Sequence, residues 1–516
     1  MRKTVLTAFF FTAFFNFLYL EMQAQSDLPL IQMSDWEYQG AFIVPPDEYG
    51  ESNANYAAGI IAVNPVNNSF YIAGHNQDRA IAEFTLPEPV NSTELSELNE
   101  AVILQDFKAL LHTTPDGNPE GIDLVSGMQF IDGQLLINAL EYYDAPGDNH
   151  HTTLIVEDAD DLENSAVSGY YALEGRAHAA GWISPIPEEW QSVLAGSYIA
   201  GNSSKYPISS RLPIGVSAFS FEPADFGTEE TVATTQLLDF SLANPLHADY
   251  ADYQNAYYNL IEVNGDTSGG HTFEDADAVV GENAIWTANS QASYGFIVPG
   301  TRTYLTIGAS GGHNSGIGYK ATQSDGNLCG GPCPYDADDR YNYYWLWDVN
   351  DLVAAMNGTL DFADVRPYDY GVFDAPFQID DYSGGLPEFH PITGGTYDPL
   401  TGKLYLTIFD GGASGSPYRR NPAIAVYTLN NPVSTTEMPT QETFQVYPNP
   451  SSGSFTVQTS RADLTMIRVT DLTGKTLQTL PFSRKVDLSN LSEGVYFLEF
   501  LSADGRVLGA EKVVLR

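Results

Sequence analysis

Short apolar runs alternate with polar, glycine-rich loops through most of the middle of the chain. Five similar segments each contain an apolar run, a loop rich in Gly, Asn and Ser, and a second apolar run that ends at an acidic or Asn-rich turn. They begin at Phe70, Leu135, Ser197, Thr303 and Leu404. A further apolar run often follows, as in "AVILQDF", "SGYYAL", "TTQLLDF" and "VRPYDYG". Runs of this length bounded by turn residues predict β-strands.

The spacing of these segments predicts the architecture. Their second strands begin near residues 81, 153, 217, 343 and 423, so the spacings are 72, 64, 126 and 80 residues. The long spacing predicts a degenerate copy within 284–299. Repeats of several strands are typical of propeller blades, which bury their faces against one another. We expect an all-β fold: a six-bladed β-propeller, with seven blades or two β-sandwiches as alternatives. The segment "WEYQGAFIVP" at 36–45 is expected to close the ring with the last blade.

The two ends of the 516-residue chain differ from this pattern. Arg2 and Lys3 precede the apolar run "VLTAFFFTAFF" and a polar stretch, which predicts a signal peptide at 1–24 and no transmembrane segment in the mature protein. The expected organisation is a propeller at 25–434, a linker at 435–442 and a small Ig-like β-sandwich at 443–516.

The C-terminal segment carries the most specific motifs. It contains "VYPNP" around Tyr447, "DLTGK" at Asp471–Lys475 and "LSEGVYFLEF" at Leu491–Phe500. Alternating apolar residues and tight turns predict a small antiparallel sandwich. The segment resembles the C-terminal sorting domain of type IX secretion cargo in Bacteroidetes. The resemblance implies an interaction with the type IX secretion machinery, and release from the cell or attachment to its outer surface.

Charge is distributed unevenly. The formal net charge is -44, and the residues between the two ends hold 12 basic and 58 acidic side chains. So acidic a surface disfavours nucleic acid and anionic lipid as partners. Seven of those 12 basic residues nevertheless fall within the five loops of the repeat, at 72–80, 138–152, 201–212, 308–342 and 409–421.

Connections between equivalent strands of each blade open on one face of a propeller, so these loops predict a shared binding surface. Arg can grip carboxylate groups, His can exchange protons near neutral pH, and Tyr can stack on sugars or donate a proton. The candidate catalytic residues are His151, His313, Tyr319 and Arg211. The candidate ligand-binding residues are His75, Asn76, Arg79, Tyr143, Asn202, Asn314, Arg340 and Arg419. The alternative is that these side chains only neutralise neighbouring carboxylates in crowded loops.

The only two cysteines, Cys329 and Cys333, form "CGGPC". In an exported protein this spacing predicts a local disulfide that staples a loop, since a redox pair uses C-x-x-C.

Acidic runs at 156–164, 273–279, 335–342 and 347–352 offer oxygen ligands for calcium, although none matches the twelve-residue EF-hand loop. Helix N-caps and solvated blade edges are the alternative explanation. The chain contains no H-E-x-x-H or P-loop motif.

Three functions fit these observations. The first is a carbohydrate-active enzyme that acts on an extracellular polysaccharide, such as a lyase for uronate-containing glycans. In that case Arg211 would bind the carboxylate, His151 or His313 would act as base, and Tyr319 as acid. The arrangement is similar to ulvan-lyase propellers only at the level of the fold. The second is a non-catalytic module that binds glycan or protein through the same face, and the third is a structural or adhesive surface protein.

Overall fold

The computed structural model describes residues 27–430 except 58, 143, 145–148, 204–212, 229–230, 242–245, 247–284, 320–321, 331, 381–387 and 414–418, and residues 445–516 except 448–450, 452, 459–463, 471–474, 493 and 503–506. The chain separates into two compact units, Met1–Pro432 and Val433–Arg516. The predicted signal peptide and linker lie outside the described residues.

Five antiparallel sheets, each built on four successive strands, make up most of the described part of the first unit. The innermost strands are β2 (Ile61–Asn64), β7 (Leu124–Ile131), β11 (Ile183–Pro185), β16 (Gln291–Ile297) and β24 (Ile392–Asp398). The second strands are β3 (Ser69–Ala73), β8 (Gln134–Leu140), β12 (Tyr198–Ser203), β17 (Thr303–Gly311) and β25 (Lys403–Ile408).

The outer half of each sheet follows the same order. The third strands are β4 (Ala80–Thr85), β9 (His151–Val156), β13 (Val216–Phe221), β20 (Arg340–Asp348) and β26 (Ala423–Leu429). The fourth strands are β6 (Ile103–Ala109), β10 (Val167–Leu173), β15 (Thr235–Leu238), β21 (Asp369–Val372) and, from the N-terminal end, β1 (Trp36–Ile43). Two short parallel strands extend the edges, β5 (Asn99–Glu100) beside β1 and β14 (Thr231–Val232) beside β10.

The five sheets form a propeller-like ring. The innermost strands contact one another in the cyclic order β2, β7, β11, β16, β24 and back to β2. The hydrophobic clusters lie between neighbouring sheets, because flat sheets with two apolar faces have to bury both. One cluster joins the first and second sheets through Tyr71 and Leu154, and another joins the fifth and first through Ile424 and Phe70.

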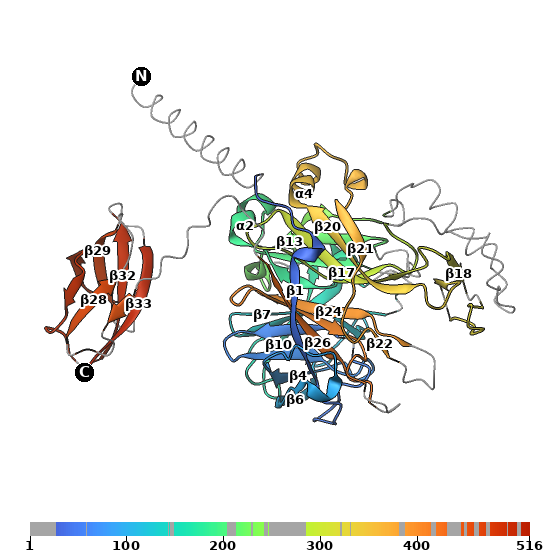
Figure 1. Cartoon of the computed structure of the whole chain (residues 1–516), viewed down its shortest axis with the longest axis horizontal. Helices are drawn as coiled ribbons and strands as arrows, with labels where there is room; N and C mark the ends of the chain where they lie inside the picture. The colour runs from blue at the N-terminus through green and yellow to red at the C-terminus, as the bar shows by residue number, and fades with distance from the viewer. Residues whose placement is uncertain are drawn as a thin grey trace, which may run out of the picture. The chain divides into compact units, whose positions relative to one another are not determined.

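The N-terminal strand closes this ring as predicted. Strand β1 pairs antiparallel with β26, from Trp36 opposite Leu429 to Ile43 opposite Ala423 (Figure 1). Residues at the two ends of the unit therefore share one sheet. The expected sixth copy at 284–299 is not a separate blade, since it contains β16, the innermost strand of the fourth sheet. The prediction of six or seven blades is thus not confirmed, and five sheets complete the cycle in the described part.

Glycine permits the close approach of the inner strands. A Cβ added to Gly394 in β24 would lie 1.9 Å from the carbonyl oxygen of Gly59, and one added to Gly127 in β7 would lie 2.0 Å from that of Gly181. No side chain fits at such distances. The central axis of the ring is nearly filled, because the void that the inner strands enclose measures only about 10 Å³. All five inner strands line this void near their first residues.

The remaining elements are short. Two hairpins, β18 (Ile317–Tyr319) with β19 (Pro332–Pro334) and β22 (Ile379–Asp380) with β23 (Glu388–Phe389), lie in loops. The described helices are α2 (Glu188–Leu194), α4 (Val349–Met356) and the 3-10 turns Met33–Asp35, Leu95–Glu97, Arg176–Ala179, Pro223–Asp225 and Phe362–Asp364. Asp348, from one of the acidic runs, caps α4 by accepting a hydrogen bond from the backbone N–H of Asn350 at 2.9 Å. No helix in the described part is long and apolar enough to span a bilayer.

The second unit is a small sandwich. One sheet contains β27 (Gln445–Tyr447), β28 (Ser454–Gln458) and β31 (Lys485–Asp487), and the other contains β30 (Thr476–Pro481), β29 (Leu464–Thr470), β32 (Gly494–Ser502) and β33 (Val507–Leu515). Phe455, Val457, Ile467 and Leu498 form part of its buried core. Alternation of buried and exposed positions along β29 agrees with the sequence pattern.

Candidate functional site

The connections between second and third strands lie at one end of the ring. The beginnings of the five inner strands surround one void, and neighbouring strands within each sheet are antiparallel. The second strand of each sheet therefore ends at the end of the ring where the inner strands begin. We call this end the loop face; it carries the described parts of 74–79, 141–150, 204–215, 312–339 and 409–422. These are the loops that the repeat predicted, and connections between successive sheets lie at the same end.

A cavity of about 360 Å³ opens on the loop face between the fourth and fifth sheets. Its volume falls within the roughly 300–1,000 Å³ typical of small-molecule sites. Polar, charged and aromatic side chains line it together. They include Asn289, Ser310, Arg340, Glu388, Phe389, Phe409, Asp410 and Arg420, beside the two half-cystines.

Arg420 organises one side of the cavity. Its Nη1 and Nη2 atoms donate to the two carboxylate oxygens of Glu388 at 2.8 and 2.7 Å, and its Nε donates to Asp410 Oδ2 at 2.8 Å. The Asp410 side chain is fully buried and that of Arg420 is 15% exposed. Hydrogen bonding to Arg420 lowers the pKa of Glu388, and the same bonds raise the pKa of Arg420. Glu388 is therefore held as an anion, which suits it to accept hydrogen bonds.

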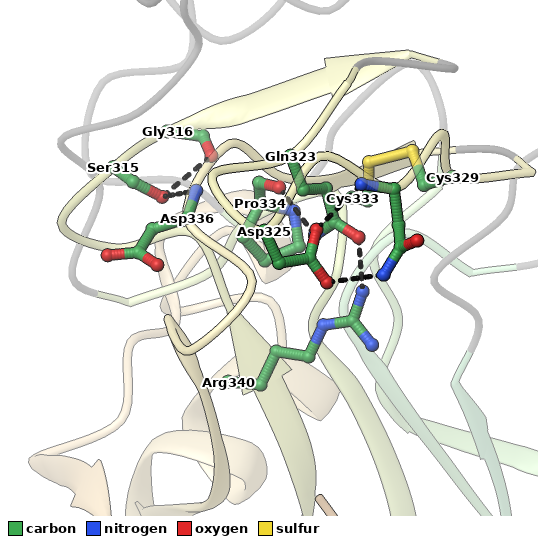
Figure 2. The surroundings of a disulfide bond; sticks show 10 residues. Ser315, Gly316, Gln323, Asp325, Cys329, Cys333, Pro334, Asp336 and Arg340 are labelled. Atoms are coloured by element: carbon green, nitrogen blue, oxygen red, sulfur yellow. Dashed lines mark hydrogen bonds between the residues drawn. A yellow bond between two sulfur atoms is a disulfide. The ribbon is translucent and has the colours of Figure 1, made fainter. Parts of the chain in front are cut away.

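Arg340 also lines the cavity, and Figure 2 shows it below the disulfide-linked loop. Its Nη2 is 3.4 Å from Gln323 Oε1, and Gln323 in turn donates to the carbonyl oxygen of Pro334 at 2.9 Å. Figure 2 shows the guanidinium directed toward Gln323. No carboxylate in the described part of the chain forms a salt bridge with Arg340, so this exposed cation is available to a ligand.

The predicted disulfide is present. Cys329 and Cys333 are bonded, and Cys333 lies in β19, which pairs with β18. Figure 2 shows the bond at the end of the loop that carries Gln323. The disulfide therefore constrains the loop that lines one side of the cavity.

Replacing Cys329 and Cys333 together by Ser should loosen this loop without unfolding the ring. The loop closed by the bond is very short, so the expected loss of stability is at most about 2 kcal/mol. Limited proteolysis should cut within 322–338 faster in the variant than in the native chain, and native protein treated with a reductant should behave like the variant. Equal cleavage rates in all three samples would show that the disulfide does not order the loop.

His313 lies next to the cavity. Its Nε2 is 2.6 Å from Ser310 Oγ, and its ring stacks on Tyr343 with 4.9 Å between centroids. The turn that follows is held by Asp339, which accepts bonds from the backbone N–H of Asn314 at 3.0 Å and of Ser315 at 2.7 Å. Burial opposes ionisation of Asp339, but hydrogen bonds from Tyr341 and Ser315 lower its pKa overall. The acidic run at 335–342 thus orders the loop.

His151 belongs to a different group of residues. Its Nδ1 is 2.6 Å from Glu120 Oε1, and the other oxygen of Glu120 accepts from the backbone N–H groups of His150 and His151 at 2.7 and 2.9 Å. Burial raises the pKa of Glu120, but these bonds outweigh it and lower the pKa. His151 starts β9 in the second sheet, whereas His313 follows β17 in the fourth, so the two histidines are not brought together.

The remaining predicted residues take several positions. His75 packs edge-on against Tyr56 with 5.8 Å between centroids, and the Arg420 guanidinium lies 5.6 Å from the same ring. Asn76 donates its backbone N–H to Tyr56 O at 3.3 Å, and Arg79 Nε donates to Asp123 O at 3.1 Å.

Asn202 has a structural position. It is 7% exposed, its Nδ2 donates to the carbonyl oxygen of Ala177 at 2.7 Å, and its Oδ1 accepts from Ser203 N–H at 2.7 Å. Asn202 lies in strand β12 and not in a loop, and its buried amide joins that strand to the turn Arg176–Ala179 instead of facing solvent.

The last five predicted residues lie at the edge of the described part or outside it. Asn314 is exposed and bonds to Asp339 through its side chain at 3.1 Å, and Arg419 is exposed beside Arg420 without lining the cavity. Arg211, Tyr143 and the side chain of Tyr319 lie outside the described residues.

Sequence reasoning missed several cavity residues. Glu388 and Phe389 lie in a connection between sheets, a class of loop that the repeat did not single out. Asp410 follows the apolar run that ends β25. An acidic residue at that position could have been recognised in the sequence as a candidate cavity residue. Asn289 carries no motif, and only the fold places it at the cavity, whereas Ser310 lies at the start of the predicted loop 308–342.

No group of three or more His, Cys, Asp or Glu side chains in the described part is arranged to hold a metal ion. The acidic run at 273–279 lies outside that part, and calcium binding stays a prediction.

Comparison with known proteins identifies the C-terminal unit. Residues 445–516 match the family described as secretion system C-terminal sorting domain. The chain is therefore cargo of type IX secretion that is secreted or attached to the cell surface, and this domain implies an interaction with the secretion machinery. This confirms the resemblance seen in the sequence.

The remaining comparisons are partial. The chain is 30% identical over 153 residues to a probable beta-galactosidase B of Penicillium rubens and 27% identical over 153 residues to one of Talaromyces marneffei. These matches cover 25% of this chain, and the chain spans about 15% of the length of these relatives.

Similar solved structures include PorZ, a surface component of the type IX secretion system of Porphyromonas gingivalis, with 12% identity, TM-score 0.22 and coverage of 91% of this chain and 53% of that one. A GH43_12 protein from a capybara gut metagenome has 8% identity, TM-score 0.32 and coverage of 93% and 91%. The Dos1 propeller has 10% identity, TM-score 0.22 and coverage of 93% and 95%. At these TM-scores the likenesses carry no functional argument.

Proposed function

We propose that this secreted or surface-attached protein binds an extracellular polysaccharide in the cavity between its fourth and fifth sheets, and that the ligand carries carboxylate groups, as uronates do. The observation that carries the proposal is the juxtaposition, in one cavity of about 360 Å³, of the exposed cation Arg340 with the anions Glu388 and Asp410 and with Phe389 and Phe409.

The chemistry of these groups matches that of a sugar acid. Arg340 can form paired hydrogen bonds with a carboxylate. Glu388, ionised and 36% exposed in its side chain, can accept hydrogen bonds from sugar hydroxyls. The faces of Phe389 and Phe409 supply apolar surface for the C–H groups of a sugar ring. A positive group in a molecule of net charge -44 also gives an anionic ligand one favourable place to bind.

A lyase acting on the same glycans remains a proposal. It requires a cation at the carboxylate and a base near the ring carbon. Among the described residues, Arg340 would supply the cation and His313 the base. Arg211 and the side chain of Tyr319 lie outside the described part. Binding without catalysis, or attachment to a surface protein, are the other outcomes of the test.

Replacing Arg340 by Gln should weaken binding of an acidic glycan without disturbing the fold. Loss of one charge-assisted contact is worth about 1.5–3 kcal/mol, which corresponds to roughly a 10- to 100-fold higher Kd. Calorimetric titration of the full chain with uronate-containing oligosaccharides measures this, and the absorbance of unsaturated product, followed in parallel, detects lyase activity.

Arg176→Gln is the matched control, because Arg176 is exposed on a different connection at the same end of the ring and does not line the cavity. Neutral oligosaccharides should bind both variants alike. No binding of any acidic glycan by the native chain, or equal losses for Arg340→Gln and Arg176→Gln, would contradict the proposal.

A further inference from the structure

A serine that lines the cavity pairs with a histidine that follows it in the chain. Ser310, the next-to-last residue of strand β17, lines the cavity although only 4% of its surface is exposed. Its Oγ lies 2.6 Å from Nε2 of His313, three residues further along the chain. A hydroxyl within hydrogen-bond reach of an imidazole nitrogen is the arrangement by which proteins activate serine as a nucleophile.

The neighbouring hydrogen bonds favour the arrangement in which Ser310 donates its proton to His313, as nucleophile activation requires. Ser290 Oγ accepts from the backbone N–H of Thr287 at 2.8 Å and lies 2.6 Å from Ser310 Oγ. The hydroxyl of Thr287 donates to the carbonyl oxygen of Gly311 at 2.7 Å. If Ser290 donates to Ser310 and Ser310 donates to His313 Nε2, every hydroxyl proton has a short acceptor. The reverse direction leaves the Ser290 proton only Thr287 Oγ1, at 3.4 Å.

The histidine ring is held in place on several sides. Its stacking on Tyr343 is nearly parallel, with 11° between planes, and Tyr341 lies 5.7 Å from it. Asp339 fixes the turn after His313 through the hydrogen bonds described above, so it is a positioning residue. Gly312 has φ +75°, and a Cβ there would lie 2.1 Å from Ile317 Cδ1. Glycine is therefore required for the turn that returns His313 to Ser310.

A hydrogen-bond donor lies beside this pair. Asn289 lines the same cavity, in the turn that carries Ser290, and its Nδ2 has no hydrogen-bond partner among the residues that the structure describes. An amide N–H in such a position can stabilise the negative charge that develops on a carbonyl oxygen during acyl transfer.

We propose that Ser310, His313 and Asn289 form an acyl-transfer site that hydrolyses ester substituents on the glycan bound in this cavity; the identity of the substrate as a glycan rests on the proposed function. Ser310 Oγ attacks the ester carbonyl carbon while its proton moves to His313 Nε2. Asn289 donates to the oxyanion. The C–O bond to the sugar then breaks, and the sugar oxygen takes the proton from His313.

Water completes the reaction. It attacks the acyl-serine, gives a proton to His313, and releases the carboxylic acid as Ser310 recovers its own proton. The products are one carboxylic acid and one sugar hydroxyl for each water consumed. Arg340, in the same cavity, would hold a carboxylate of the glycan while this step occurs.

Two measurements on the full chain test the inference. A serine-directed fluorophosphonate should label Ser310, as identified by peptide mass spectrometry, and O-acetylated uronate oligosaccharides should release acetate. Ser310→Ala should abolish labelling and lower acetate release at least about 10³-fold. His313→Gln should lower both rates by a similar factor, whereas Asn289→Ala should lower acetate release about 10²-fold with little change in stability, since its Nδ2 forms no bond with the described residues.

His178→Gln is the matched control. His178 also pairs through Nδ1, with Asp239 at 2.5 Å, but it lies in another connection and does not line the cavity, so both rates should be unchanged. Binding of de-acetylated oligosaccharide separates the two proposals. Binding without labelling or acetate release would overturn the acyl-transfer site alone, whereas Ser310 labelling without binding of any glycan would support the site and overturn the glycan as its substrate.

Discussion

Gly394→Ala should destabilise the ring by about 3 kcal/mol, because the new Cβ would overlap the carbonyl oxygen of Gly59 at 1.9 Å, and overpacked sites of this kind cost roughly 1–3 kcal/mol or more. Backbone atoms of neighbouring sheets meet there, so the clash cannot be relieved by rotating a side chain. Urea unfolding followed by tryptophan fluorescence measures the effect on this unit alone, since all six Trp residues lie before residue 432.

Gly371→Ala provides the comparison. Gly371 lies in the outer strand β21, and a Cβ there would meet only Tyr344, at 3.4 Å or more. The expected change is within about 0.5 kcal/mol. If Gly394→Ala unfolds at the same urea concentration as Gly371→Ala, the inner strands of the first and fifth sheets do not approach one another as described.

Arg420→Met should cost about 3–5 kcal/mol, because it removes the guanidinium that forms a salt bridge with the fully buried carboxylate of Asp410. The unfolding measurement above detects this loss. The double variant Arg420→Met with Asp410→Asn also removes the buried carboxylate charge and should recover at least half of the lost stability. Asn also tolerates the left-handed backbone of Asp410, whose φ is +57°.

Arg340→Gln is the control for this experiment, because the Arg340 residue is exposed and, among the residues that the structure describes, its side chain makes only a long contact with Gln323. Its stability should change by less than about 0.5 kcal/mol. A single Arg420→Met variant within 1 kcal/mol of the native chain would show that the cluster is not as buried as the structure indicates.

The strands and the loop face were predictable because their signals are local. Apolar runs of strand length and Gly, Asn and Ser at turns depend on nearby residues, and the segment at 36–45 resembled a missing fourth strand. The sheet number was not predictable from spacing alone. Two long connections, 239–290 between the third and fourth sheets and 312–339 within the fourth sheet, lengthen the interval between the third strands β13 and β20 and imitate an extra copy.

The cavity could be predicted only in part. Enrichment of basic residues in the loops pointed to Arg340 and to the neighbourhood of Arg420, since charge is visible in the sequence. Asp410 lies in the same loop as Arg420, but Glu388 approaches Arg420 only because the connection between β21 and β24 meets that loop in the fold. Asn202 shows the converse, because a polar residue in a predicted loop faces inward to satisfy backbone groups.

Hydrogen–deuterium exchange of the full chain, with and without a uronate oligosaccharide at saturating concentration, tests the central claim most directly. We predict slower exchange in the segments that line the cavity, at 309–311, 329–340, 388–391 and 409–420, and unchanged exchange at 138–152 around His151. Slower exchange confined to 138–152, or no change anywhere while the ligand is bound, would contradict the assignment of this cavity as the binding site.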